Sequence, residues 1–176
     1  LPICLIRLIR NDISCYAMHT NYDVLGMAEL SAEMLNLKET SVLEEVLEGE
    51  GIGRTGKLPE AMTLRDCAEL VKERFQLPNM KVFGELNKII RTAAISPGAG
   101  KSMVQPALAA GAEVLITGDI DHHTGIDMKD CGLAIIDAGH YGIEHIYMED
   151  IRAFLAEKFP ELRLVTAPVV QPFEVI

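Results

Sequence analysis

The chain has 176 residues, of which 49% are hydrophobic and 24% are charged, and its formal net charge is −10. This composition is typical of a globular protein, and no apolar run reaches the roughly 20 residues that a membrane-spanning helix needs. The acidic surface repels nucleic-acid phosphates and anionic membranes, so we expect neither as a partner, and we expect a cytoplasmic protein. We interpret the widely spaced cysteines as reduced thiols; they are Cys4, Cys15, Cys67 and Cys131.

The first half of the chain predicts two helices, one strand and a hairpin with a glycine turn. In chain order these are a strand at 13–18, a helix at 24–36, a hairpin at 38–58 and a helix at 62–77. Thr63 or Met62 begins the second helix, and if Thr63 is the N-cap, Asp66 helps to cap it. A domain boundary, if there is one, lies between residues 37 and 60.

From about residue 90 strand and helix patterns alternate. We expect strands at 89–96, 112–119, 133–139 and 162–168, helices at 100–111 and 141–158, and a short polar segment at 122–132. Strands that are apolar on both faces and separated by helices indicate a mostly parallel sheet covered on two sides. The predicted fold class is therefore α/β.

The glycine-rich segment "SPGAGKS", residues 96–102, resembles a phosphate loop but has Ile95 where the full motif needs a glycine. Nucleotide triphosphate hydrolysis is therefore not expected. The segment is either a substrate-facing or anion-binding loop, or a plain tight turn.

A polar cluster follows the buried strand that ends near residue 118. It comprises Asp119, Asp121, His122, His123 and Asp127. In open α/β sheets ligands bind beyond the carboxyl ends of strands, so this cluster is a candidate site. The alternative is a solvated loop whose aspartates cap the following turn.

Two histidine–carboxylate pairs have helical spacing after strand-like runs: His19 with Asp23, and His140 with Glu144. Residues four apart lie on one face of a helix, so each pair can converge on one cation. Mixed nitrogen and oxygen donors suit zinc, iron, manganese or cobalt. The alternative is a surface histidine beside a carboxylate that the helix dipole stabilises.

Five motifs occur in an order that resembles the Nif-three-like family of dinuclear-metal-centre hexameric proteins, whose members are often labelled GTP cyclohydrolase type 2 homologues. They are "LIRNDISCYAMHTNYDVLGMAELSAEMLNL", "EGIGRTGKL", "AAISPGAGKSM", "VLITGDIDHH" and "LAIIDAGHYGIE". The resemblance covers essentially the whole chain.

The resemblance implies a fold of two interlinked α/β domains and a toroidal homohexamer. Residues 1–60 would be part of the first domain, and residues 61–176 would be the remaining region, which contributes the second half of the metal site. It also implies a centre of two divalent metal ions, zinc, iron or manganese, in the complete protein. Asp23, His140 and Glu144 match metal ligands, and Glu144 matches a bridging one.

The same resemblance gives His19 the place of a site histidine, either a ligand or just outside the ligand shell, and gives His123 a place near the cavity. The family's remaining ligands come from a His-His-Pro segment that would precede Leu1. Nothing in the chain replaces it, so we expect a fragment of a longer protein or a shortened member.

The functional expectation is a metal-dependent hydrolase acting on a nucleotide or pterin-like substrate. His19 or His123 would transfer protons as the catalytic groups, and the loop at 96–101 would face the substrate. The alternative is a non-catalytic role, either binding and handling metal or serving as a protein-interaction scaffold.

Overall fold

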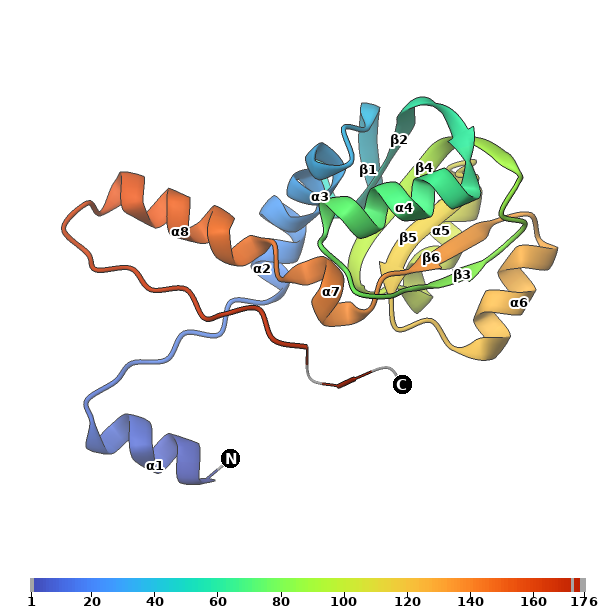
Figure 1. Ribbon diagram of the computed structural model, residues 1–176. Coiled ribbons are helices and arrows are strands. Elements are labelled where there is room, and N and C mark those ends of the chain that lie inside the picture. The colour runs from blue at the N-terminus through green and yellow to red at the C-terminus, as the bar shows by residue number, and fades with distance from the viewer. Residues whose placement is uncertain (1, 172, 175–176) are drawn as a thin grey trace.

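The computed structural model describes residues 2–171 and 173–174, and its centre is one six-stranded sheet (Figure 1). The order of the strands across the sheet is β1-β2-β4-β5-β6-β3. Their bounds are β1 Lys38–Leu47, β2 Glu50–Thr63, β3 Lys81–Phe83, β4 Ile89–Ala99, β5 Val114–Gly118 and β6 Ala134–Asp137.

The sheet is mixed, so the expectation of a mostly parallel sheet was wrong, although the α/β class is confirmed. Only β4–β5 and β5–β6 pair in parallel, while β1–β2, β2–β4 and β3–β6 are antiparallel. Parallel neighbours need a crossover connection, which α5 (Val104–Ala109) supplies between β4 and β5 and α6 (His122–Asp130) supplies between β5 and β6. The hairpin of β1 and β2 was predicted and is confirmed. Strands from both sides of the expected domain boundary at residue 60 share this one sheet.

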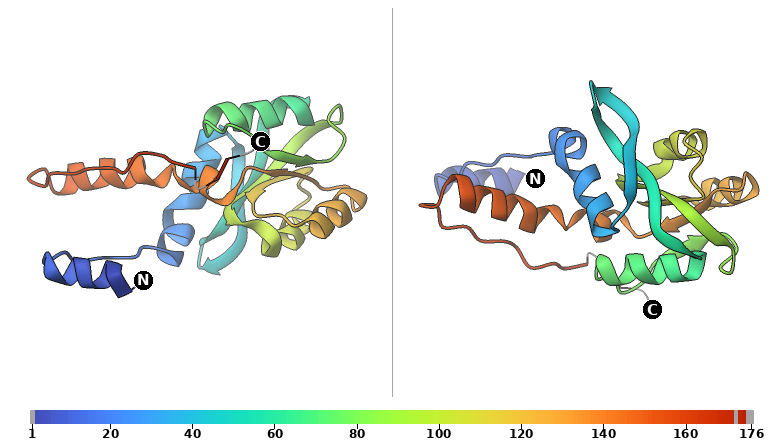
Figure 2. Two further views of the ribbon diagram at one scale, coloured as in Figure 1. Left: turned by 60° about the horizontal axis from the view of Figure 1, so that its bottom comes forward. Right: turned by 90° about the horizontal axis from the view of Figure 1, so that it is seen from above.

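Helices cover both faces of the sheet. The helical elements of the described chain are α1 Pro2–Arg10, α2 Thr20–Tyr22, the π-helix η1 Asp23–Met27, α3 Ala28–Met34, α4 Leu64–Arg74, the 3-10 helix η2 Gly100–Met103, α5 Val104–Ala109, α6 His122–Asp130, α7 His140–Glu144 and α8 Tyr147–Lys158. α3 and α4 lie on one face, and α5 and α6 lie on the other (Figure 2).

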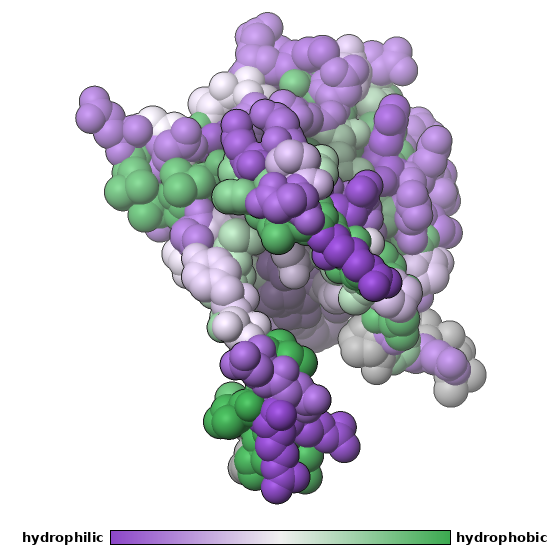
Figure 3. Space-filling model, turned by 90° about the vertical axis from the view of Figure 1, so that its left-hand side faces the viewer, coloured by the Kyte–Doolittle hydropathy of each residue, from purple (hydrophilic) through white to green (hydrophobic). Residues whose placement is uncertain are grey.

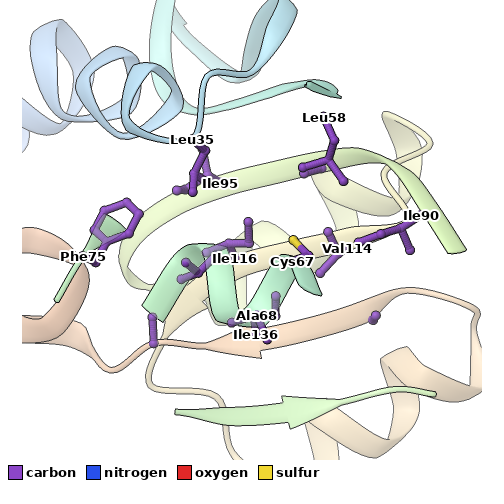
Figure 4. Packing of buried hydrophobic residues seen from close by; sticks show 14 of the residues in the cluster. Leu35, Leu58, Cys67, Ala68, Phe75, Ile90, Ile95, Val114, Ile116 and Ile136 are labelled. Atoms are coloured by element: carbon purple, nitrogen blue, oxygen red, sulfur yellow. The ribbon is translucent and has the colours of Figure 1, made fainter. Parts of the chain in front are cut away.

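Alternation along the central strands divides the core into two clusters. Ile95 of β4 and Ile116 of β5 face α4, where they join the cluster shown in Figure 4, while Ala94 and Leu115 face α5 and α6. Successive side chains of a strand point to opposite faces, so a strand buried on both faces reads as a continuous apolar run. This is why the sequence located β4, β5 and β6.

Two predicted strands are absent from the part of the chain that the structure describes. Residues 13–19 and 162–168 form neither helix nor strand, and Ile13 and Val165 in them are 55% and 79% exposed. A strand needs a neighbour for its backbone hydrogen bonds, and an apolar pattern alone does not supply one. The edge position beside β6 is instead taken by β3, which was not predicted.

The polar segment at 122–132 is the helix α6, which was also not predicted. Its N-cap is Asp121, whose side chain accepts a hydrogen bond from the backbone N–H of Thr124 at 3.0 Å. That bond and the Lys101 ammonium, 2.9 Å away, hold the pKa of the Asp121 carboxyl below its usual range. Local capping thus makes a helix from a sequence with few apolar residues.

The predicted helix at 141–158 is two helices, because the chain turns at His145 and Ile146. α7 buries Gly142 and Ile143, whereas no residue of α8 is buried. α8 and α1 therefore project from the body of the molecule (Figures 1 and 2). Figure 3, which faces that end, shows hydrophobic side chains on the surface of α1 at the bottom of the view. Among the described residues, no helix has the length and apolar character to cross a membrane.

Candidate metal centre

The candidate site lies where β4, β5 and β6 end. Asp119 follows β5 directly, and Asp137, the last residue of β6, is separated from His140 by only Ala138 and Gly139. Gly139 is the N-cap of α7 and has φ of 74°, a conformation that glycine adopts without strain. The carboxyl edge of a parallel pair is the usual ligand-binding edge of an α/β sheet, and the chain places its histidine–carboxylate pair there.

The imidazole of His140 lies between two carboxylates. Its Nδ1 is 2.8 Å from Asp119 Oδ2, and its Nε2 is 3.3 Å from Glu144 Oε2. A carboxylate only accepts hydrogen bonds, so Nδ1–H donates to Asp119 and fixes the plane of the ring. Nε2 and the Glu144 carboxylate consequently face the same small volume beside the first turn of α7.

The charges around this pair are predominantly negative. Partial burial lowers the pKa of His140, but the hydrogen bond to Asp119 and the charges of Glu144, Asp119 and Asp23 outweigh it and raise that pKa above its usual value. Burial raises the pKa of Glu144, and the charges of Asp23 and Asp119 add to this, against the opposing effects of His140 and His19. The raised pKa of His140 indicates that the surrounding carboxylates favour a positive charge at this place.

The irregular end of β4, residues 96–99, closes one side of the site. A Cβ on Gly98 would lie 2.6 Å from Glu144 Oε1 and 3.7 Å from His140 Nε2, so the bare backbone passes directly beside both groups. The hydroxyl of the buried Thr117 donates to the Ser96 carbonyl at 2.6 Å and holds this end of the strand. The segment at 96–102 thus borders the candidate metal centre.

The structure brings four of the five predicted site residues into one electrostatic neighbourhood. Asp23 is the first residue of η1 and is half-buried, and its charge acts on both His140 and Glu144. His19 is exposed, and its Nδ1 lies 2.9 Å from Thr20 Oγ1. It also lies close enough to Glu144 to lower the pKa of that carboxylate.

His123 lies apart from this group. It is an exposed residue of α6 whose ring contacts His122, with centroids 5.5 Å apart. Within the described part of the chain, no hydrogen bond or ion pair joins it to His140, Glu144 or Asp23.

The chemistry of His140 and Glu144 fits a divalent metal ion. An imidazole nitrogen and a carboxylate oxygen about 3 Å apart match two neighbouring ligands of one ion, and the Nδ1–H bond to Asp119 is the kind of support that metal-binding histidines use. Over residues 2–171 and 173–174, however, no group of three or more histidine, cysteine or acidic side chains is placed to hold a metal. The fit therefore covers one side of a coordination shell.

Two residues of this site had a weaker sequence signal. Asp119 stood in the polar cluster after β5, and Gly98 stood in the glycine-rich segment, but spacing along the chain did not connect either with His140. Only the sheet brings the ends of β4, β5 and β6 together. Asp119 also has a positive φ of 55°, an uncommon conformation that often occurs at functional sites.

A cavity of about 590 Å³ adjoins Asp119 and His140. Apolar side chains from the segment before β3 line it, among them Leu77 and Met80, together with Lys81 of β3. Its volume is within the range of small-molecule sites.

Comparison with known proteins places the chain in one family. The chain is 40% identical over 158 residues to a Streptococcus pneumoniae protein called GTP cyclohydrolase 1 type 2 homolog, covering 86% of this chain and 59% of that protein. A Clostridium perfringens protein of the same name is 35% identical over 144 residues, covering 80% and 55%. The chain thus spans little more than half the length of these curated relatives.

Solved structures agree with the fold. A Staphylococcus aureus hypothetical protein superimposes with a TM-score of 0.86 and 27% identity, covering 99% of this chain and 72% of that one. A Bacillus cereus protein related to NIF3 has the same fold at a TM-score of 0.87 and 21% identity, covering 97% and 76%. Residues 3–172 match the family described as Duf34/NIF3 (NGG1p interacting factor 3). The chain therefore belongs to the Duf34/NIF3 family.

Proposed function

We propose that the chain contributes a metal-binding site to a metal-dependent hydrolase that acts on a nucleotide-like or pterin-like substrate. The observation that carries the proposal is the placement of His140 Nε2 and Glu144 Oε2 3.3 Å apart, with Nδ1 of the same ring bound to Asp119. The names of the curated relatives support the reaction class.

Each residue has a defined task in this proposal. His140 and Glu144 would hold the metal from one side, and Asp23, whose charge already acts on both, would approach from η1. A divalent metal held there supplies Lewis-acid chemistry at neutral pH. Asp119 keeps the imidazole in the tautomer that leaves Nε2 free for the metal.

His19 is the better placed of the two candidate proton-transfer groups, because it lies close enough to Glu144 to affect the pKa of that carboxylate. His123 instead lies on α6, where its ring contacts His122. The substrate's ring system would occupy the cavity beside Asp119 and His140, where apolar walls and the Lys81 ammonium offer contacts to a flat, polar-edged heterocycle.

A second candidate is a metal-binding protein without catalysis, acting in metal handling or as an interaction scaffold. The observation in its favour is that the described residues form no group of three or more donors placed to hold a metal, so they supply only part of the ligand shell that catalysis would need. The family description also names a protein interaction.

The test is metal content per chain, measured by mass spectrometry after purification without added metal, followed by titration of the stripped protein with Co²⁺. Glu144→Gln keeps the shape of the side chain and removes its charge. Glu149→Gln on α8, where the carboxylate contacts Arg152, is the matched control. We expect metal in the wild type and in the control, and a loss of at least about 10-fold in Co²⁺ affinity in Glu144→Gln.

Equal metal content and equal Co²⁺ affinity in all three proteins would overturn the proposed site. Turnover of a nucleotide panel then separates the two candidates. Hydrolysis that disappears in Glu144→Gln supports the enzyme, and stoichiometric metal without turnover of any nucleotide supports the non-catalytic role.

A further inference from the structure

A buried carboxylate lies beneath the candidate metal centre. Asp137 ends β6, and its side chain is only 2% exposed. Burying a carboxylate is costly unless it is paired and hydrogen-bonded. The partners of Asp137 therefore indicate its role in the structure.

Asp137 has three partners from three different segments. Its Oδ2 accepts a hydrogen bond from the backbone N–H of Ile120 at 3.2 Å and lies 2.6 Å from Lys81 Nζ. Its Oδ1 accepts from the backbone N–H of Gly139 at 3.1 Å. Lys81 also donates to the Ile120 carbonyl at 3.3 Å, which closes the network.

These backbone partners adjoin the two residues whose side chains meet at the site. Ile120 follows Asp119, and Gly139 precedes His140, so one carboxylate binds the main chain next to each end of the Asp119–His140 hydrogen bond. Asp119 has a positive φ of 55°, a conformation that is costly for a residue other than glycine. Such backbone conformations persist where the surroundings hold them, and the Asp137 bonds supply that restraint.

We propose that Asp137 is a positioning residue, which sets the orientation of the His140 imidazole by fixing the backbone on both sides of the Asp119–His140 bond. It acts through these two residues, and Lys81 neutralises its charge. The inference about the imidazole stands on the hydrogen bonds above. Its consequence for metal affinity rests on the proposed function.

The test compares two carboxylates that make the same kind of bond at opposite ends of the sheet. In Asp137→Asn, the amide oxygen can still accept from Gly139 N–H, but an NH₂ group then replaces Oδ2. This NH₂ group faces the Ile120 N–H and the Lys81 ammonium, which are donors themselves, so both of these hydrogen bonds are lost. The control is Glu113→Gln, because Glu113 Oε2 accepts from the backbone N–H groups of Arg91 and Thr92 at 2.6 Å and 3.1 Å before β5 begins. Both variants are expected to lose stability, as measured by urea unfolding.

The deciding readout is the imidazole ¹⁵N spectrum of metal-free, histidine-labelled protein, with the His140 signals assigned from His140→Gln. At a pH above the raised pKa of His140, where the ring is neutral, we expect one fixed tautomer with the proton on Nδ1 in the wild type and in Glu113→Gln. In Asp137→Asn we expect the shifts of a tautomer mixture. Co²⁺ affinity should fall by about 10- to 100-fold in Asp137→Asn and stay constant in the control.

A wild-type His140 spectrum in folded Asp137→Asn would overturn the proposal. If Asp137→Asn does not fold, Asp137→Glu keeps the charge for Lys81 but displaces both acceptor atoms by one methylene, and the same spectral change is expected. If the wild type binds no Co²⁺, the proposed function fails, while the imidazole spectrum still decides the role of Asp137.

Discussion

At the scale of single residues, the site depends on backbone positions where a side chain cannot be accommodated. A Cβ on Gly118 would lie 2.6 Å from the backbone nitrogen of His140, and one on Gly98 would meet the Glu144 carboxylate. The first contact is with rigid main chain, and the second is with the end of a flexible side chain. Substitution at Gly98 is therefore expected to displace the Glu144 side chain and to leave the fold intact.

Gly98→Ala should displace the Glu144 carboxylate, and Gly111→Ala is its matched control. Both glycines have positive φ, 85° and 71°, but nothing lies within 4 Å of a Cβ at Gly111. We expect each variant to lose about 1–2 kcal/mol of unfolding free energy through the strained backbone. Only Gly98→Ala should also lose Co²⁺ affinity, and equal affinity in the two variants would contradict the contact with Glu144.

Cys67 is the cysteine whose thiol we expect to be unreactive, because it is buried in the core. It lies on the buried face of α4, and burial raises the pKa of its thiol to about 12, whereas Cys4, Cys15 and Cys131 are exposed. We expect iodoacetamide at pH 8 to leave Cys67 unmodified in the native protein, because both access and the reactive thiolate are lacking. Peptide mapping measures this, with urea-unfolded protein as the control. Native labelling as fast as in urea would refute it.

At the scale of elements, α4 shows how far local sequence determines structure. Its N-cap is Thr63, whose side chain accepts a hydrogen bond from the backbone N–H of Asp66 at 3.1 Å. Thr63 was one of the two residues predicted to begin this helix. Thr63→Ala should lower the unfolding free energy by about 1 kcal/mol, while Thr63→Ser, which keeps the acceptor, should lose much less. Urea unfolding measures both, and equal losses would indicate that the methyl group matters and the cap does not.

The elements that sequence could not predict depend on contacts between distant segments. The hairpin, the apolar strands β4 to β6 and the cap of α4 carry local signals. The three-residue β3 does not, and its place beside β6 is a choice among distant partners. Residues 13–18 have a strand-like pattern, but the structure gives them no neighbouring strand.

The same division applies to the site. His140 and Glu144 were found together because their four-residue spacing is a local property of α7. Asp119, Gly98 and Asp137 approach them only through the register of β4, β5 and β6, which the pattern along the chain does not encode.

At the scale of the whole molecule, the sheet and the helices that cover it form a compact body, and α1 and α8 project from it (Figure 1). α1 has nine residues, too few for a stable helix in isolation, and Ile3, Leu5 and Ile9 on it are 67%, 59% and 79% exposed. A contiguous apolar surface of this kind is typical of an interface. The resemblance that implies a homohexamer gives it an occupant, a second copy of the chain.

Light scattering on the purified chain should therefore give a mass that is a multiple of the monomer, with six copies as the expected number. Ile9→Glu places a charge in the exposed face of α1 and should shift the mass toward the monomer, because burying an unpaired carboxylate in an interface is unfavourable. The control is Ile126→Glu, which adds the same charge at a 41%-exposed position of α6 on the opposite part of the molecule. A monomeric wild type would contradict self-association. An Ile9→Glu assembly as large as the control would show that α1 lies outside the interface, and α8, with Phe154 52% exposed, would become the face to alter next.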